Sequence, residues 1–134
     1  MKTDTLTVEA LDSTIENALE LLLSRQHNDG YWEFELETDT TITAEYILLN
    51  HFLNEIDDDL EGKLAVYLRR NQNEDGGWPL YEGGEFNISA SVKAYFALKM
   101  VGDGVDMPHM RSAREAILAH GGAVNCNVFT RITL

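Results

Sequence analysis

The sequence carries one short stretch twice, as QHNDGYW at residues 26–32 and as QNEDGGW at residues 72–78. In both copies an Asp-Gly pair stands three and four positions after a Gln, and a Trp stands six positions after it. The copies begin 46 residues apart, and each follows an apolar run with helical spacing. A repeat of this length is typical of stacked helical units, which bury their apolar faces against one another.

The residue types of this stretch suit the end of a helix. Its glycine supplies the backbone freedom that a helix exit requires, and its Gln can bond the unpaired backbone of an adjacent helix end. Its Trp can pack on the Gln while the indole N–H meets a polar partner. Two unrelated loops would not share all four positions, so we predict a structural role for both copies. The six residues are Gln26, Gly30, Trp32, Gln72, Gly76 and Trp78.

The spacing of apolar residues predicts helices along the chain and no strand. We expect a flexible lead-in over residues 1–12, and then a capping box at Ser13-Thr14-Ile15-Glu16 that begins the first helix. Tyr95 repeats Tyr46 at an interval of 49, which relates the fourth helix to the second. The expected helices span about residues 13–25, 40–54, 57–71, 89–100 and 106–120, and a sixth begins near residue 127.

Helix pairs repeated in this way predict an all-α fold, either a solenoid or a closed α/α toroid. The sixth helix has no partner within the sequence, so we expect residues 13–134 to be the first portion of a larger toroid, ending inside a helix.

The acidic run Asp57-Asp58-Asp59 allows two interpretations. With Glu61 it matches a diphosphate–magnesium pattern, but a second acidic motif to face it is not evident. Its position at a helix start favours capping, because carboxylates there accept from free backbone N–H groups and meet the positive end of the helix dipole.

Composition excludes several classes of function. The formal net charge of -13 argues against a nucleic-acid surface and against electrostatic binding to anionic lipid. The single cysteine, Cys126, allows neither an internal disulfide nor a thiolate zinc cluster. No apolar run can span a bilayer, and the start of the chain lacks a signal-peptide pattern. The histidines have no metal-ligand spacing: they are His27, His51, His109 and His120.

Four further stretches accompany the repeat: AEYILL at residues 44–49, KAYFALK at 93–99, HGG at 120–122 and VFTR at 128–131. Together with the two Gln–Trp stretches, which resemble QW repeats, they resemble the amino-terminal region of the bacterial squalene–hopene cyclases. The resemblance runs from about Ser13 to Leu134 and implies a terpenoid-cyclase α/α toroid.

The resemblance also implies roles for individual residues. In hopene cyclases the glutamate that matches Glu45 belongs to a polar, water-holding network near the place where the final cation is quenched. Lys93 and Asn127 stand where some relatives have a carboxylate and an arginine, so the network here differs in composition. The resemblance further implies that Leu36 and Phe129 line the cavity. The alternative for Glu45 is a helix-start glutamate that faces solvent.

The activity implied by the resemblance is proton-initiated cyclisation of squalene to hopene or hopanol, without a cofactor. This family protonates an alkene with the acid of an Asp-x-Asp-Asp motif, which the sequence does not contain. We therefore expect the catalytic acid to lie outside residues 1–134, and this segment to act as scaffold and cavity wall. The resemblance also implies a homodimer, peripheral or monotopic on the cytoplasmic side of the bacterial membrane.

Two other functions stay open. One is a cyclase of another linear terpene on the same toroid, with a zinc-dependent protein prenyltransferase as a weaker relative because its metal ligands are not visible. The other is a non-catalytic helical-repeat binding module. Such a module would end in a polar, self-capping helix, whereas residues 128–134 are largely apolar.

Overall fold

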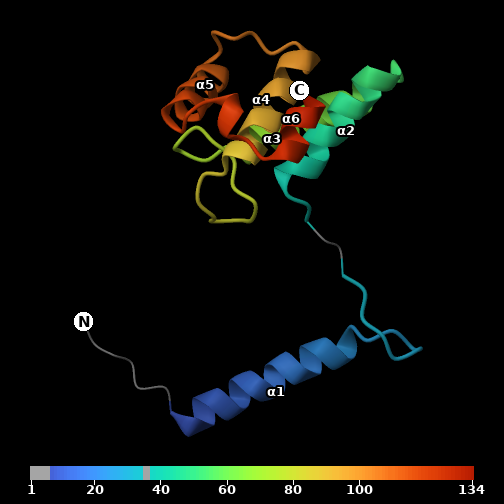
Figure 1. Cartoon of the computed structure of the whole chain (residues 1–134). Coiled ribbons are helices and arrows are strands. Elements are labelled where there is room, and N and C mark those ends of the chain that lie inside the picture. The colour runs from blue at the N-terminus through green and yellow to red at the C-terminus, as the bar shows by residue number, and fades with distance from the viewer. Residues whose placement is uncertain (1–6, 35–36) are drawn as a thin grey trace. The chain divides into compact units, whose positions relative to one another are not determined.

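The computed structural model describes residues 7–34 and 37–134, and its regular elements there are all helical. This confirms the all-α class. The described residues form two compact units, divided between residues 36 and 37. The elements are α1 (Val8–Ser24), α2 (Thr40–Leu53), α3 (Asp58–Arg70), α4 (Ile88–Val101), α5 (Pro108–Ala119), the 3-10 turn η1 (Ala123–Asn125) and α6 (Val128–Thr133) (Figure 1).

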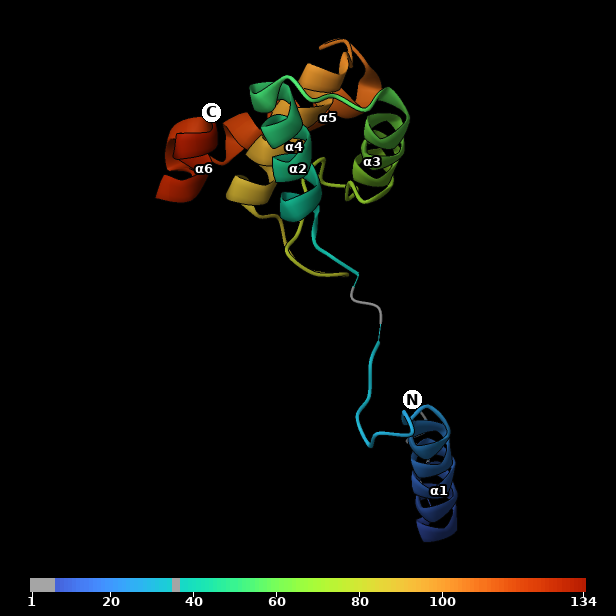
Figure 2. The ribbon, with the colours of Figure 1, turned by 90° about the vertical axis from the view of Figure 1, so that its right-hand side faces the viewer.

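In the second unit the helices alternate in direction. α2 and α4 lie side by side and run in the same direction (Figures 1 and 2). α3, which stands between them in the chain, runs in the opposite direction. α4 is the central helix, because α2, α3, α5, η1 and α6 all pack on it. This arrangement of helix pairs is the one that the 46-residue repeat predicts.

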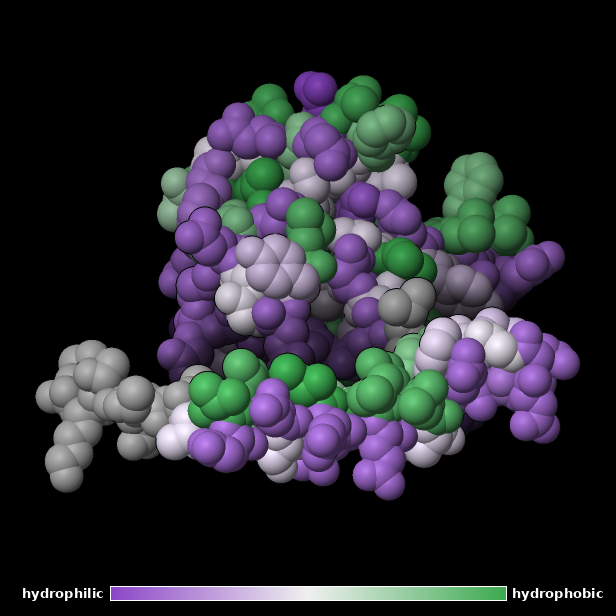
Figure 3. Space-filling model, turned by 90° about the horizontal axis from the view of Figure 1, so that it is seen from below, coloured by the Kyte–Doolittle hydropathy of each residue, from purple (hydrophilic) through white to green (hydrophobic). Residues whose placement is uncertain are grey.

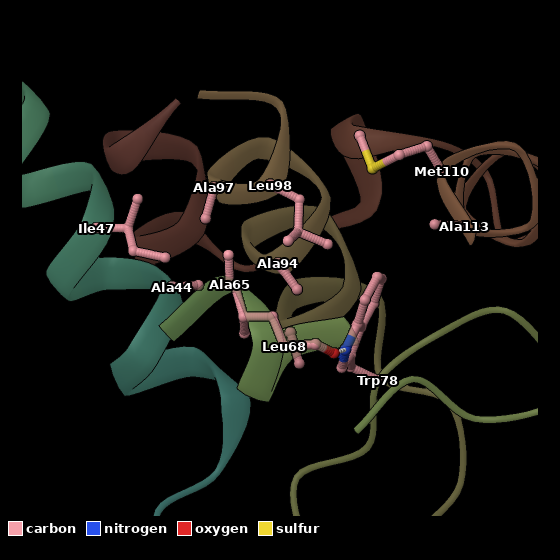
Figure 4. Packing of buried hydrophobic residues seen from close by; sticks show 11 residues of the cluster. Ala44, Ile47, Ala65, Leu68, Trp78, Ala94, Ala97, Leu98, Met110 and Ala113 are labelled. Carbon is pink, nitrogen blue, oxygen red and sulfur yellow. Dashed lines mark hydrogen bonds between the residues drawn. The ribbon is translucent and has the colours of Figure 1, made fainter. Parts of the chain in front are cut away.

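The core of this unit contains many small side chains. A methyl group at a helix crossing lets two helix axes approach closely, and the larger residues Leu68, Leu98 and Trp78 fill the remaining space (Figure 4). All three are fully buried. The alanines with no exposed surface are Ala44, Ala65, Ala90, Ala94, Ala97 and Ala113.

Matching caps fix the ends of α2 and α4. Asp39 and Asn87 cap the two amino termini with their side chains, and Asn54 and Gly102 end the helices in the left-handed conformation. Both pairs of caps recur at an interval of 48, so the interval of 49 expected from the tyrosines is wrong by one residue.

The acidic run before α3 acts as a cap, as predicted. The Asp57 carboxylate accepts from the backbone N–H groups of Asp59 at 3.1 Å and Leu60 at 3.0 Å. Asp58, Asp59 and Glu61 then occupy the first turn, where the helix dipole favours negative charge.

The first unit is one long helix followed by the first Gln–Trp stretch. Its apolar residues gather along one side of α1 and its polar residues along the other (Figure 3). Within this unit the apolar stripe is uncovered, since Leu11, Ile15, Leu19 and Leu22 are each about half exposed.

The predicted start of this helix is wrong. The helix begins at Val8 instead of Ser13, because the Thr7 hydroxyl already accepts from the backbone N–H of Ala10 at 3.2 Å. Residues 8–12 therefore belong to α1 and not to a flexible lead-in, whereas residues 1–6 lie outside the described residues.

Candidate functional site

The second Gln–Trp stretch closes the carboxyl end of α3. The indole N–H of Trp78 donates to the backbone oxygen of Leu68 at 2.8 Å, in the last turn of that helix (Figure 4). The side-chain amide of Gln72 donates to the backbone oxygens of Gly76 at 2.7 Å and His109 at 3.0 Å. Since His109 lies in the first turn of α5, the predicted bond from Gln72 to an adjacent helix end is confirmed.

The first stretch repeats this geometry at the end of α1. The indole N–H of Trp32 donates to the backbone oxygen of Leu22 at 2.7 Å, and the Gln26 amide donates to that of Gly30 at 2.7 Å. Among the described residues the Gln26 amide bonds its own loop, so the adjacent helix end predicted for it is not found. The packing of each Trp on its Gln stays a prediction.

The two copies differ in what surrounds them. Trp78 is fully buried, whereas Trp32 is 44% exposed. Gly76 lies so close to α5 that an added Cβ would come within 2.6 Å of the Ser112 backbone oxygen, but a Cβ on Gly30 would meet open space. Both glycines have positive φ, near +86° and +89° respectively. The same hydrogen-bonded arrangement therefore occurs twice, once with its Trp fully buried and once with its Trp partly exposed.

A cluster of charged side chains also connects α3, α4 and α5 in the second unit. The Arg69 guanidinium donates to both carboxylate oxygens of Asp103, at 2.6 and 2.9 Å, and Nε2 of His109 lies 2.7 Å from one of them. The hydrogen bonds from Arg69 hold the pKa of the Asp103 carboxyl below its ordinary value, and His109 adds to this against the opposing effect of burial. The cluster ties the ends of α3 and α4 to the start of α5.

Glu45 makes an ion pair that the sequence alone did not predict. The ammonium of Lys93 on α4 donates to Oε1 of Glu45 on α2. The Lys93 side chain is 8% exposed and that of Glu45 is 44% exposed, so the cation is buried and the carboxylate is partly open. The two residues are 48 positions apart, the interval between the caps of α2 and α4.

The surroundings of Lys93 include Cys126, which stands just before α6. Burial raises the pKa of the Cys126 thiol, and the nearby positive charges of Arg131 and Lys93 oppose this. Asn127 caps α6 by accepting from Thr130, and its own backbone N–H donates to the Ser89 hydroxyl.

Of the two residues that are predicted to line the cavity, the structure describes one. Phe129 is 71% exposed on α6, and Leu36 lies outside the described residues. Their part in a cavity stays a prediction.

One depression of about 420 Å³ opens at the start of α2. The end of α3 and the loop of residues 79–83 form its other walls. The Tyr67 hydroxyl donates to the Thr38 backbone oxygen at 2.5 Å, and burial, with the charges of Glu37 and Asp39, raises the pKa of Tyr67. Within residues 7–34 and 37–134, no group of three or more His, Cys, Asp or Glu residues is arranged to hold a metal ion.

Comparison with known proteins decides the family. The family described as "squalene-hopene cyclase N-terminal domain" matches residues 15–134. The chain belongs to this family. A squalene-hopene cyclase of Schizosaccharomyces japonicus is 57% identical over 142 residues, and one of Bradyrhizobium diazoefficiens is 59% identical over 127 residues. These alignments cover 100% and 94% of this chain but 22% and 19% of the relatives.

A more distant relative carries a different name. The dammaradiene synthase of Dryopteris crassirhizoma is 35% identical over 124 residues, which is 92% of this chain and 18% of that protein. The chain thus spans about a fifth of the length of each of these three relatives. The squalene–hopene cyclase family resemblance drawn from the repeated stretches is confirmed.

Proposed function

We propose that this chain is the amino-terminal part of a squalene–hopene cyclase, an isomerase that cyclises squalene to hopene or hopanol after protonating an alkene. The observation that carries the proposal is the family match over residues 15–134. In this proposal the segment is scaffold and cavity wall, and the acid that starts the reaction lies in the rest of the enzyme, because Asp-x-Asp-Asp is absent from the sequence.

The exposed side of α2 fits such a wall. Ile42, Tyr46, Leu49 and Leu53 lie on one face of the helix and are each about half exposed. On the opposite side, α2 packs against α4 through Ala44 and Ile47, which are buried. Cyclisation through carbocations requires a dry, preshaped space with fixed electrostatics, so a rigid apolar wall contributes to catalysis without taking part in bond making.

The proposal extends to partners and location. The substrate is squalene, no cofactor is needed, and the rest of the cyclase chain covers the apolar faces that this segment leaves open. We place the enzyme, as a homodimer, peripherally or monotopically on the cytoplasmic side of the membrane. Among the described helices, none combines the length and apolar character needed to cross a membrane.

A cyclase with another product is the second candidate. It is favoured by one observation, the 35% identity to a dammaradiene synthase. The much higher identity of 57% and 59% to relatives named squalene-hopene cyclases places it behind the first. A helical-repeat binding module has less support, because the family match and the 57% and 59% identities are to cyclases.

A chimeric enzyme tests the proposal. Residues 15–134 of this chain replace the matching region of the Bradyrhizobium diazoefficiens cyclase, and purified protein is incubated with squalene. We expect pentacyclic alkene and alcohol products at a rate within about tenfold of the parent. A Trp78→Ala chimera should lose this activity with its fold, and Lys63→Ala, at an exposed position, should keep it. A folded chimera without product would contradict the proposal.

A further inference from the structure

The depression at the start of α2 carries more negative than positive charge. The carboxylates of Glu37, Asp39 and Glu82 line it. The Arg70 guanidinium lies in the same wall, so three negative charges face one positive charge. Burial and the charges of Glu37 and Asp39 raise the pKa of Tyr67, which also lines the depression. A positive group is therefore favoured over a negative one inside it.

The amino terminus of α2 does not reverse this preference. Free N–H groups at a helix start attract anions, but the Asp39 carboxylate already occupies this place. It accepts from the backbone N–H of Thr41 at 2.8 Å and from the Thr41 hydroxyl at 2.5 Å. Among the described residues these carboxylates form no group of three arranged to hold a metal ion. The cation that fits is therefore an organic one.

Thr40 adds an acceptor without a partner. It lines the depression and is 3% exposed, and its hydroxyl oxygen has no hydrogen-bond partner among the described residues. A buried hydroxyl in this state is costly, and a donor on the floor of the depression would supply the missing bond. Ammonium and guanidinium groups fit this need, because they carry several donors and no acceptor.

The rim of the depression is apolar. Pro79, Leu80 and Tyr81 form it, and Leu80 and Tyr81 are 47% and 71% exposed. Lysine and arginine side chains combine an apolar stem with a cationic end, so the stem can pack on this rim while the charge reaches the carboxylates. The ring of Tyr81 can also hold a cation over its face.

We propose that this depression receives a lysine or arginine side chain from the part of the cyclase outside residues 1–134. The proposal rests on the proposed function, in which the chain continues into a longer enzyme. Among the described residues, none of the ion pairs involves Glu37, Asp39 or Glu82, so their partner lies elsewhere. A second copy of this segment is a poor partner, because each copy carries a formal net charge of -13.

The test uses the chimera described above, with a benzoylphenylalanine photo-cross-linker in place of Tyr81. Irradiation, digestion and mass spectrometry should join position 81 to a peptide from outside residues 1–134 that carries Lys or Arg. Glu82→Lys should lower the cross-link yield by about threefold, as loss of an exposed charge contact does. Thr40→Val should lower it too. Glu115→Lys, an equal charge change at an exposed position of α5 outside the depression, should leave it unchanged.

The outcomes separate this inference from the proposed function. A cross-link to a peptide with neither Lys nor Arg, a cross-link between two copies, or no cross-link in the folded chimera would overturn the inference. Equal yields in Glu82→Lys and Glu115→Lys would also overturn it. The proposed function is judged from the products formed from squalene, and it fails if the folded chimera forms none, whatever the cross-link shows.

Discussion

The indole N–H groups of Trp78 and Trp32 each donate to a backbone oxygen near the end of a helix, α3 and α1 respectively. Only Trp78 is also fully buried. Trp78→Ala should lower the unfolding free energy by roughly 3–5 kcal/mol, as truncation of a large buried aromatic does. Trp32→Ala should cost clearly less in this chain, because 44% of Trp32 stays in contact with solvent. Urea unfolding followed by far-ultraviolet circular dichroism measures both. Equal costs would contradict the difference in burial.

The two glycines give a matched comparison of backbone and packing. An alanine at either position meets a positive φ, near +86° for Gly76 and +89° for Gly30. At Gly76 the new methyl group would also press on the Ser112 backbone. We expect Gly30→Ala to cost about 1 kcal/mol from conformation alone, and Gly76→Ala to cost at least twice that. Thermal melts of the two variants check the prediction, and a smaller loss at Gly76 would refute it.

Residue types alone predicted the Gln–Trp device but not the Glu45–Lys93 pair. Most of the device is local, since hydrogen bonds within it join residues four and ten positions apart, although Gln72 also donates to His109, 37 positions away. The pair joins positions 48 apart, and only the packing of α2 against α4 brings them together. Glu45 and Lys93 occupy equivalent positions in α2 and α4, counted from the helix caps. This equivalence could have predicted the pair, but it becomes visible only when the repeat interval is taken as 48.

At the scale of elements, the ends of α3 and α4 and the start of α5 depend on Asp103. Its folded-state pKa is depressed by Arg69, so its contribution to stability is present above the unfolded value of about 3.9 and is lost as pH falls through the lower folded value. We expect Asp103→Asn to cost about 1–3 kcal/mol at neutral pH. The figure lies below that of a fully buried pair because the Arg69 side chain is 35% exposed.

Urea unfolding at a series of pH values between neutrality and strong acid tests this assignment. The unchanged chain should lose stability faster than Asp103→Asn as the pH falls below about 4. Parallel curves for the two proteins would remove Asp103 from the acid response. Arg69→Met serves as the matched control, since it should reduce the same pH dependence from the other side of the ion pair.

Helix boundaries were predictable where a cap residue and a turn residue coincide, as at Asp57 and at Gly102. The start of α1 was missed because Ser13-Thr14-Ile15-Glu16 matches a capping box although Thr7 caps the helix first. The short η1 turn was also missed, since residues 123–125 carry no periodic pattern. Local patterns identify possible caps, and competition among them is decided by which apolar residues can extend the helix.

For the whole molecule, we expect residues 1–134 alone to be inactive on squalene and to expose apolar surface. Leu118, Val128, Phe129, Ile132 and Leu134 are each half exposed or more, and patches of this kind drive association. Ile117, which precedes Leu118 in α5, does not belong to this surface, because it is buried in a cluster with Val92 and Cys126. Light scattering should detect self-association, and a dye for apolar surface should bind.

The controls for this experiment are direct. Phe129→Ser and Ile132→Ser should together reduce dye binding without loss of helix content, since neither side chain is in the core. A monomer that binds no dye would contradict the expected apolar patch. Hopene formed by the purified chain, with full-length cyclase excluded, would overturn the assignment of the chemistry to residues outside it.

The repeated device also gives the protein two intrinsic probes. The sequence has two tryptophans, and one stands at the end of α1 and the other at the end of α3 in matching hydrogen-bonded positions. Each indole N–H donates to a backbone oxygen of its own helix, Leu22 in α1 or Leu68 in α3. Because the two rings differ in solvent contact, their fluorescence emission maxima and their N–H exchange rates should differ. The unfolding of each unit can therefore be followed through the fluorescence of its own tryptophan, without an added label.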